Sequence, residues 1–166
     1  MIFRIPSGKH RARPIRFGLW WRKNSFTWVV KFTESCRYDL GNEDQFDTNK
    51  LCGIGYLPGH HKESARFGWR YWPDMGWVEL SAYCYVKGQR VIKNIAFCEI
   101  GKEYRLRLQV LATSYYFDVY EPDQVKAAGI VTVEHFHDKK FKYRLGVFFG
   151  GNRPAPKEIK IELSKS

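Results

Sequence analysis

The fold is decided by the stretch Trp77-Val78-Glu79-Leu80-Ser81-Ala82-Tyr83-Cys84-Tyr85-Val86, which is followed by Lys87-Gly88-Gln89-Arg90. Small or aliphatic side chains alternate here with polar or aromatic ones, and a period of two is typical of a strand with one buried face. Gly88 can adopt the positive φ of a tight hairpin turn, so a second strand is expected to begin near Arg90. The side chains expected to face the core are Val78, Leu80, Ala82, Cys84 and Val86.

The same alternation recurs along most of the chain, interrupted by Gly, Pro, Asn and Asp, and it predicts an all-β fold. Many short strands in a small chain indicate an antiparallel two-sheet sandwich, a jelly roll. One short helix is conceivable at 122–128, ended by Gly129. Strands are expected at about 15–21, 26–33, 50–57, 64–71, 76–86, 90–98, 103–111, 114–120, 129–134, 142–149 and 157–163.

The length of 166 residues fits one domain, 1–166, that begins with a basic segment, 1–14. Residues 1–6 lack the pattern of a signal peptide, and no apolar run reaches the roughly 20 residues of a membrane span. A cytoplasmic protein with no membrane contact is therefore expected, although a trimmed secreted form stays open. No CxxC pair occurs, and reduced, mostly buried thiols are expected at Cys36, Cys52, Cys84 and Cys98.

The formal net charge is +11, and the excess is concentrated at the N-terminus. Residues 1–33 contain eight basic side chains and no acidic one. Such a stretch attracts phosphates, sulfates or carboxylates, but it is equally consistent with a merely solubilising basic surface.

Alternation also predicts which side chains point away from the core. In 77–86 these are Trp77, Glu79, Ser81, Tyr83 and Tyr85. In 104–110 the residues expected to point outward are Arg105, Arg107 and Gln109, with Tyr104, Leu106, Leu108 and Val110 inward. In 142–149 they are Lys142, Arg144 and Phe148, with Tyr143, Leu145, Val147 and Phe149 inward. If these strands share one sheet, its open face is basic and aromatic; the alternative that they belong to different sheets stays open.

Several segments together resemble the jelly rolls of the concanavalin A-like lectin/glucanase superfamily, over about residues 26–163. The segments that carry the resemblance are 50–56, 64–70, 78–86 and 145–152, with Pro154-Ala155-Pro156. The resemblance implies two curved antiparallel sheets, a concave face that commonly holds glycans, and termini near each other. Members of the superfamily include lectins, glycoside hydrolases and polysaccharide lyases.

The catalytic motifs of those enzymes are mostly missing. The E-x-D-x-E triplet of the retaining glucanases is absent and Glu79 stands alone on its strand, whereas a glycosidase needs two carboxylates. The lyases of this fold use Tyr, His and a neutralising Arg or Gln. Residues of these types, outside any lyase motif, are Tyr83, Tyr85, His60, His61, Arg66 and Arg144.

Two metal sites are conceivable. His135 and His137 are two residues apart and would share one face of an extended segment, but a third ligand cannot be identified. A structural calcium ion could lie near Asp39, Asp44 and Asp47, while the alternative is a loop whose Asp and Asn side chains bond their own backbone.

The sequence therefore favours a non-catalytic binding module that recognises an anionic glycan or a phosphorylated small ligand. The predicted ligand-binding residues are Arg66, Trp77, Glu79, Tyr83, Tyr85, Arg105, Arg107, Lys142 and Arg144. One alternative is a polysaccharide lyase-like enzyme, for which His60, His61 and Tyr83 are the catalytic candidates. Another is a cytoplasmic bacterial or phage protein that binds nucleotides or nucleic acid. The oligomeric state is left open.

Overall fold

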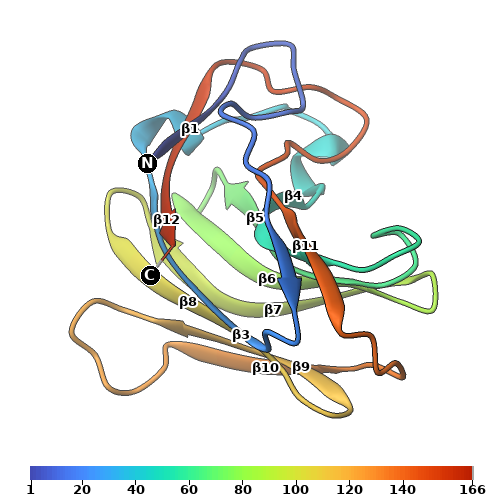
Figure 1. The fold of residues 1–166 in the computed structure, drawn as a ribbon. Helices are drawn as coiled ribbons and strands as arrows, with labels where there is room; N and C mark the ends of the chain where they lie inside the picture. Colours follow the sequence, from blue (N-terminus) through green and yellow to red (C-terminus); the bar gives the residue numbers. More distant parts are fainter. Residues whose placement is uncertain (166) are drawn as a thin grey trace.

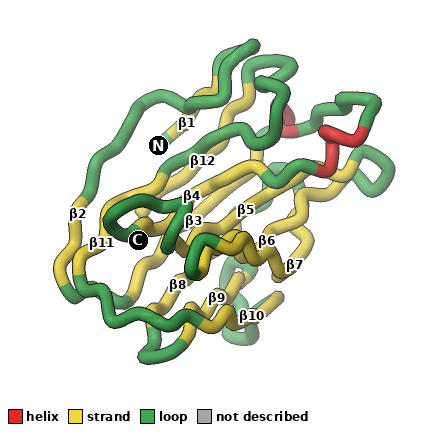
Figure 2. Tube along the Cα trace, turned by 90° about the vertical axis from the view of Figure 1, so that its right-hand side faces the viewer, coloured by secondary structure: helices red, strands yellow, loops and turns green. Residues whose placement is uncertain are grey.

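The computed structural model describes residues 1–165 as two six-stranded antiparallel sheets, and the prediction of an all-β sandwich is confirmed (Figures 1 and 2). The first sheet has the order β1 (Ile2–Ile5), β12 (Ile159–Lys165), β3 (Ser25–Phe32), β8 (Glu103–Val110), β9 (Ser114–Tyr120) and β10 (Gly129–Glu134). The second has the order β2 (Leu19–Trp21), β11 (Phe141–Leu145), β4 (Asn49–Gly55), β5 (Ser64–Trp72), β6 (Trp77–Val86) and β7 (Gln89–Glu99). Two short 3-10 turns, η1 (Glu34–Cys36) and η2 (Glu43–Phe46), precede β4.

The core lies between the two sheets and is rich in aromatic rings. Phe67 of β5 contacts Trp28 of β3 and Phe117 of β9, with ring centroids 6.2 and 5.1 Å apart, both in edge-to-face geometry. Burial of each such side chain stabilises the fold by about 1.5–3 kcal/mol. The prediction that Val78, Leu80, Ala82, Cys84 and Val86 face the core is confirmed, since all are buried.

The predicted hairpin at Lys87-Gly88 is also confirmed. Lys87 and Gly88 both have positive φ, 50° and 80°, in the turn that joins β6 to β7. The proposed helix at 122–128 is wrong: Asp123 has a φ of 58°, which a right-handed helix does not allow, and the segment forms turns.

The two ends of the chain lie side by side, as the superfamily resemblance implies. Strand β1, which the alternation did not predict, pairs with β12, and the Leu163 amide donates to the Met1 carbonyl at 2.8 Å. Figure 1 shows the labelled termini on the same side of the molecule.

The four cysteines are free and buried, as expected, and burial raises the pKa of Cys36 and Cys84 to about 12. No helix within residues 1–165 is long and apolar enough to cross a membrane.

A β-bulge in β4 determines which side chains reach the outer face of the second sheet. Lys50 pairs with Gly68 and Cys52 with Phe67, so Leu51 is an extra residue. Leu51 and Cys52 are both buried, and the alternation between faces therefore changes phase at this point.

Strand β11 pairs with the part of β4 that follows the bulge, and this overturns the predicted orientations within 142–145. Tyr143 pairs with Gly55 and lies on the outer face, whereas Arg144 pairs with the buried Ile54 and lies on the inner side. Lys142 is likewise buried rather than exposed. Phe148 pairs with Lys50, on the other side of the bulge, and keeps its predicted outward orientation.

Candidate functional site

Three neighbouring strands bring two cations and a tyrosine together on the outer face of the second sheet. We call Lys50 of β4, Arg66 of β5 and Tyr83 of β6 the anion site. The Arg66 Cζ lies 5.0 Å, and the Lys50 Nζ 4.8 Å, from the centroid of the Tyr83 ring. Arg66 and Tyr83 are directly opposite each other in the β5–β6 ladder, so the backbone register fixes their contact. The Tyr83 ring is only 4% exposed, and it therefore supports the cations instead of offering an open stacking surface.

Two glycines of β4 make room for this arrangement. A Cβ at Gly53 would lie 2.9 Å from the Arg66 Cγ, and one at Gly55 would lie 2.7 Å from the Tyr143 Cζ. Because both glycines face outward, the side chains of Arg66 and Tyr143 lie over the backbone of β4.

Arg66 has no acidic partner. It is 6% exposed, yet within residues 1–165 no carboxylate lies within 4.0 Å of it, and its buried Nε has no hydrogen-bond acceptor. Burial lowers the pKa of Arg66. Buried charges in proteins are normally paired, so an unpaired guanidinium is a site that favours an anion.

Lys50 is affected by the same surroundings. Burial, followed by repulsion from Arg66, lowers the pKa of Lys50 to about 8, and attraction by Asp47 only partly opposes these effects. An anion placed between the two cations would favour the charged form of Lys50.

A loop and a strand add two titratable side chains beside the anion site. His60, on the 57–62 loop, has its Nδ1 3.4 Å from the Tyr143 hydroxyl. Burial and the Arg66 charge lower the pKa of His60, and burial raises that of Tyr143, so both are neutral near pH 7. The ring of His61 packs edge-on against Tyr85 at 5.1 Å.

A cavity of about 560 Å³ connects the anion site with the N-terminal segment. Its lining contains no aspartate or glutamate among the described residues, and the remaining lining is largely apolar. Its basic and histidine side chains are Arg11, Arg16, Lys50, His60, His61, Arg66 and Arg144. Because cations line the cavity without acidic side chains, it favours an anionic ligand.

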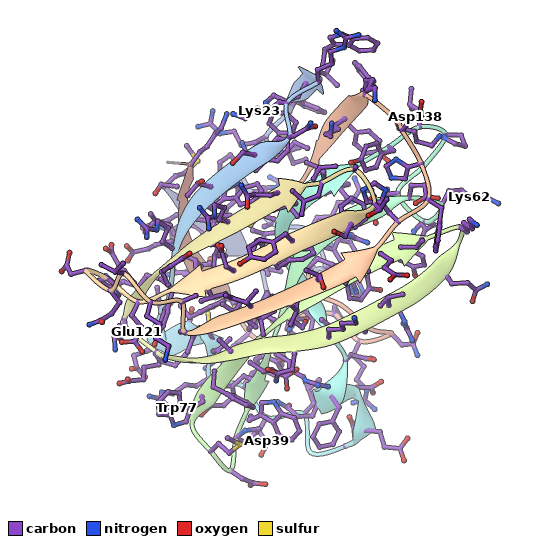
Figure 3. The ribbon with its side chains drawn as sticks, turned by 90° about the horizontal axis from the view of Figure 1, so that it is seen from below. Lys23, Asp39, Lys62, Trp77, Glu121 and Asp138 are labelled. Carbon is purple, nitrogen blue, oxygen red and sulfur yellow. The ribbon has the colours of Figure 1, made fainter. Side chains whose placement is uncertain are left out.

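The structure brings together five of the residues predicted from sequence: His60, His61, Arg66, Tyr83 and Tyr85. Arg144 also lines the cavity, but it reaches it from the inner side of β11. Trp77 lies on the same face of β6 but at its far end, and Figure 3 shows it well separated from Lys62.

Glu79 is not free to bind a ligand, contrary to the prediction. Arg70 donates to its two oxygens at 3.0 and 2.8 Å, and the Trp72 indole Nε1 donates at 2.8 Å. Glu79 is buried, and these three donors satisfy it.

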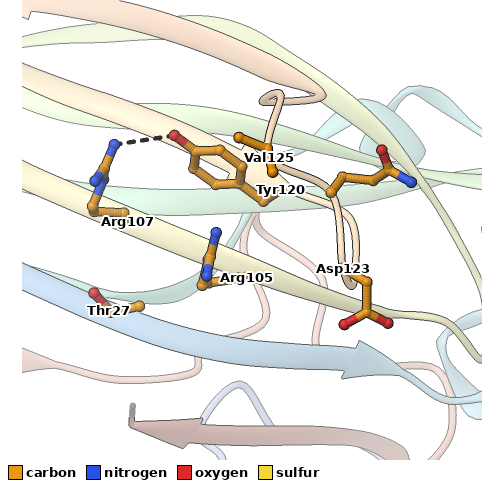
Figure 4. A pocket seen from close by; sticks show the side chains of 7 residues that line it. Thr27, Arg105, Arg107, Tyr120, Asp123 and Val125 are labelled. Carbon is orange, nitrogen blue, oxygen red and sulfur yellow. Dashed lines mark hydrogen bonds between the residues drawn. The ribbon is translucent and has the colours of Figure 1, made fainter.

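Arg105 and Arg107 are on the other sheet, so of the two arrangements left open by the sequence, the one with the strands in different sheets is correct and these two arginines are not part of the site. Strand β8 pairs with β3 and β9, and its arginines lie on the outer face of the first sheet (Figure 4). The guanidinium of Arg107 is held by the buried Asp118, and that of Arg105 lies 4.7 Å from the Tyr120 ring centroid.

Lys142 is also removed from any ligand surface. Its side chain is buried, and its Nζ donates to the Asn24 Oδ1 at 3.1 Å. Strict alternation failed here because β11 follows the shifted part of β4.

The conceivable metal sites have other partners. His137 Nε2 lies 2.6 Å from the Tyr115 hydroxyl, and His135 Nε2 lies 3.0 Å from the Leu111 carbonyl. The Asp39 carboxylate accepts from the Gly41 amide, and Asp44 pairs with Arg153. In the part of the chain that the structure describes, no three His, Cys, Asp or Glu side chains are arranged to hold a metal ion. The calcium site near Asp39, Asp44 and Asp47 stays a prediction.

The sequence reasoning missed Lys50 and Tyr143. The signal that could have found them is Gly53-Ile54-Gly55, because two glycines on the outward phase of a strand leave space for neighbouring side chains.

Comparison with solved structures identifies the architecture. The alginate lyase from Klebsiella pneumoniae superposes with a TM-score of 0.64 at 8% identity, covering 86% of this chain and 59% of the lyase. The chain has the jelly-roll fold of that lyase. An alginate lyase from Pseudomonas aeruginosa gives 0.57 at 10% identity, covering 89% of this chain and 67% of the lyase. A functionally unknown protein from Saccharomyces cerevisiae superposes with a TM-score of 0.58 at 10% identity, covering 98% of this chain and 84% of the yeast protein.

These likenesses confirm the resemblance to the concanavalin A-like jelly rolls at the level of the fold alone. The chain spans 59% of the length of the Klebsiella lyase. No protein-family model and no curated protein matches the sequence.

Proposed function

We propose that the outer face of the second sheet binds an acidic polysaccharide, with the anion site holding a carboxylate of one sugar. The observation that supports this most directly is the buried Arg66, which has no carboxylate within 4.0 Å in residues 1–165. Its planar guanidinium can bind both oxygens of a carboxylate, and the Lys50 ammonium adds a second charge.

The fold supports a glycan as the carrier of that anion. Solved jelly rolls of the same architecture are named alginate lyases, and one is a family 7 alginate lyase in complex with its product, with a TM-score of 0.59. Sugars that carry carboxylates match the cationic cavity, which no acidic residue of the described chain lines.

Binding to an alginate tetrasaccharide, measured by isothermal titration calorimetry, tests the proposal. We expect Arg66→Met to weaken binding by roughly 30-fold or more, the effect of truncating one partner of a buried charge pair. Arg105→Met is the matched control because Arg105 is an exposed arginine on the other sheet, and it should leave the affinity unchanged. Absence of tetrasaccharide binding, or equal loss in both variants, would contradict the proposal; neutral cellotetraose should bind much more weakly than the acidic sugar.

The contact between His60 and Tyr143 supports a second candidate, eliminative cleavage of the bound polysaccharide. Neutralisation of the carboxylate by Arg66 would make the sugar C5 proton more acidic. His60 would accept that proton as the C4–O bond breaks and a C4=C5 double bond forms, and the leaving oxygen would take a proton from Tyr143. Ultraviolet absorbance of an unsaturated product would appear with the wild type and disappear with Tyr143→Phe, whereas a pure binder gives no absorbance with either.

The nucleic-acid alternative has less support at the anion site than a glycan has. Sequence-tolerant binding of single strands depends on aromatic rings that are open to stacking. The Tyr83 ring is buried and already contacts two cations, so it offers no such surface.

A further inference from the structure

A row of exposed apolar side chains lies along the edge of the second sheet, beside the cavity. We call Ile15, Phe17, Leu19 and Trp21 the edge row; they are 61, 93, 68 and 66% exposed. Strand β2 is the outermost strand of this sheet and pairs only with β11 within residues 1–165. Single exposed apolar residues are ordinary, but four large ones within seven residues of the chain are unusual.

Leu19 and Trp21, the edge-row residues within β2, face the same side of the sheet as the anion site. Leu19 pairs with Tyr143 and Trp21 pairs with Phe141, and side chains of directly paired residues share a face. Tyr143 lies on the outer face next to His60. The cavity itself joins the two regions, because Ile15 and Phe17 line it together with Arg66.

We propose that the edge row is a platform on which further sugar rings of the same acidic chain pack, beyond the sugar that the anion site holds. This inference rests on the proposed function. Pyranose rings have apolar C–H faces that pack well on aromatic and aliphatic surfaces. From Phe17 to Trp21 the extended chain covers about 13 Å, enough for more than one ring. The site is therefore extended, with a charged part at one end and an apolar part at the other.

Charge favours this occupant over a second copy of the protein. The edge row is flanked by Arg16, Arg22 and Lys23, and residues 1–33 contain no acidic side chain. Two copies joined along β2 would place these cations against each other without a counterion. An acidic polysaccharide, in contrast, gains from the same cations while its rings cover the apolar surface.

The test measures how affinity depends on chain length, with alginate oligosaccharides of two, four and six sugars. The variants are Trp21→Ala and Phe17→Ala, and Phe136→Ala is the matched control because it removes an exposed phenylalanine away from the row. For the wild type and the control, affinity should rise at least tenfold from two to six sugars. Both edge-row variants should lose most of that rise, and Trp21→Ala, whose side chain lies outside the cavity lining, should bind the disaccharide as the wild type does. Their thermal melting curves should match that of the wild type, since the removed side chains are exposed.

Each contrary outcome has a distinct meaning. If no alginate oligosaccharide binds the wild type, the proposed function and the platform both fail. If the oligosaccharides bind but the length dependence survives in Trp21→Ala and Phe17→Ala, the platform alone is overturned. It is also overturned if sedimentation shows a dimer that these substitutions dissociate, or if anionic vesicles bind through the row while the sugar affinities are unaffected.

Discussion

Two arginines on one face of β5 have opposite surroundings. Arg70 lies opposite Glu79 in the β5–β6 ladder and shares two hydrogen bonds with its carboxylate. Arg66, four residues earlier, lies opposite Tyr83 and meets no carboxylate in the described chain. One arginine of β5 is therefore part of a structural ion pair, whereas the other is a cation without a counterion. The residue directly opposite each arginine on β6 makes the difference.

The largest expected contrast is in stability. Arg70→Met leaves the buried Glu79 carboxylate without its counterion, and it should lower the free energy of unfolding by about 3–5 kcal/mol. Arg66→Met removes a charge that is buried without a partner, so its free energy of unfolding should stay within about 1 kcal/mol of the wild type or exceed it. Urea denaturation of both variants measures the contrast. Equal destabilisation by the two substitutions would show that Arg66 has a structural role.

The sequence was sufficient to predict the sandwich and much of the site. Period-two alternation located most of the strands, the inward face of β6 and the outward position of Tyr83. Arg66, His60 and His61 became candidates because lyases of the resembled fold use residues of these types. Local alternation contains no information about which sheet a strand joins. Arg105 and Arg107 were therefore correctly expected to point outward, but they were grouped with ligand-binding residues of the other sheet.

The remaining errors depend on long-range pairing. The bulge at Leu51 reverses the orientation of Lys142 and Tyr143, which are distant from it in sequence, through the ladder between β4 and β11. Glu79 was correctly expected on the outer face, but its partner Arg70 is determined by strand register, which alternation alone does not give.

Exchange of the cross-strand neighbour should convert one kind of arginine into the other. Tyr83→Glu places a carboxylate opposite Arg66, as Glu79 is placed opposite Arg70. This internal anion should compete with the ligand and reduce the affinity for an alginate tetrasaccharide by roughly 30-fold, about 2 kcal/mol. Tyr83→Gln is the matched control: glutamine has nearly the same shape as glutamate but no charge, so this variant reports the effect of losing the tyrosine ring alone.

The two substitutions at position 83 also predict a stability difference. The Glu variant should exceed the Gln variant in free energy of unfolding by about 1.5–3 kcal/mol, because a charged acceptor satisfies a buried guanidinium better than a neutral one. If the Glu variant binds the sugar as well as the Gln variant does, Arg66 is not the ligand's anchor.

The smallest expected effect is a pH dependence of the sugar affinity at the anion site, the site of Arg66. In the free protein the pKa of Lys50 is lowered to about 8, and a bound carboxylate would raise it. At pH values between the pKa of Lys50 in the free protein and its pKa in the complex, binding therefore takes up a proton. The affinity should be fully present below pH 8 and fall as the pH rises through that value, by about tenfold for a one-unit difference between free and bound pKa. Calorimetric titrations at a series of pH values measure this, and Lys50→Met should abolish the step. If a pH-dependent step near pH 8 persists in Lys50→Met, another group titrates there. That group is neither His60, whose pKa is lowered from 6.5, nor Tyr143, whose pKa is raised from 10.0.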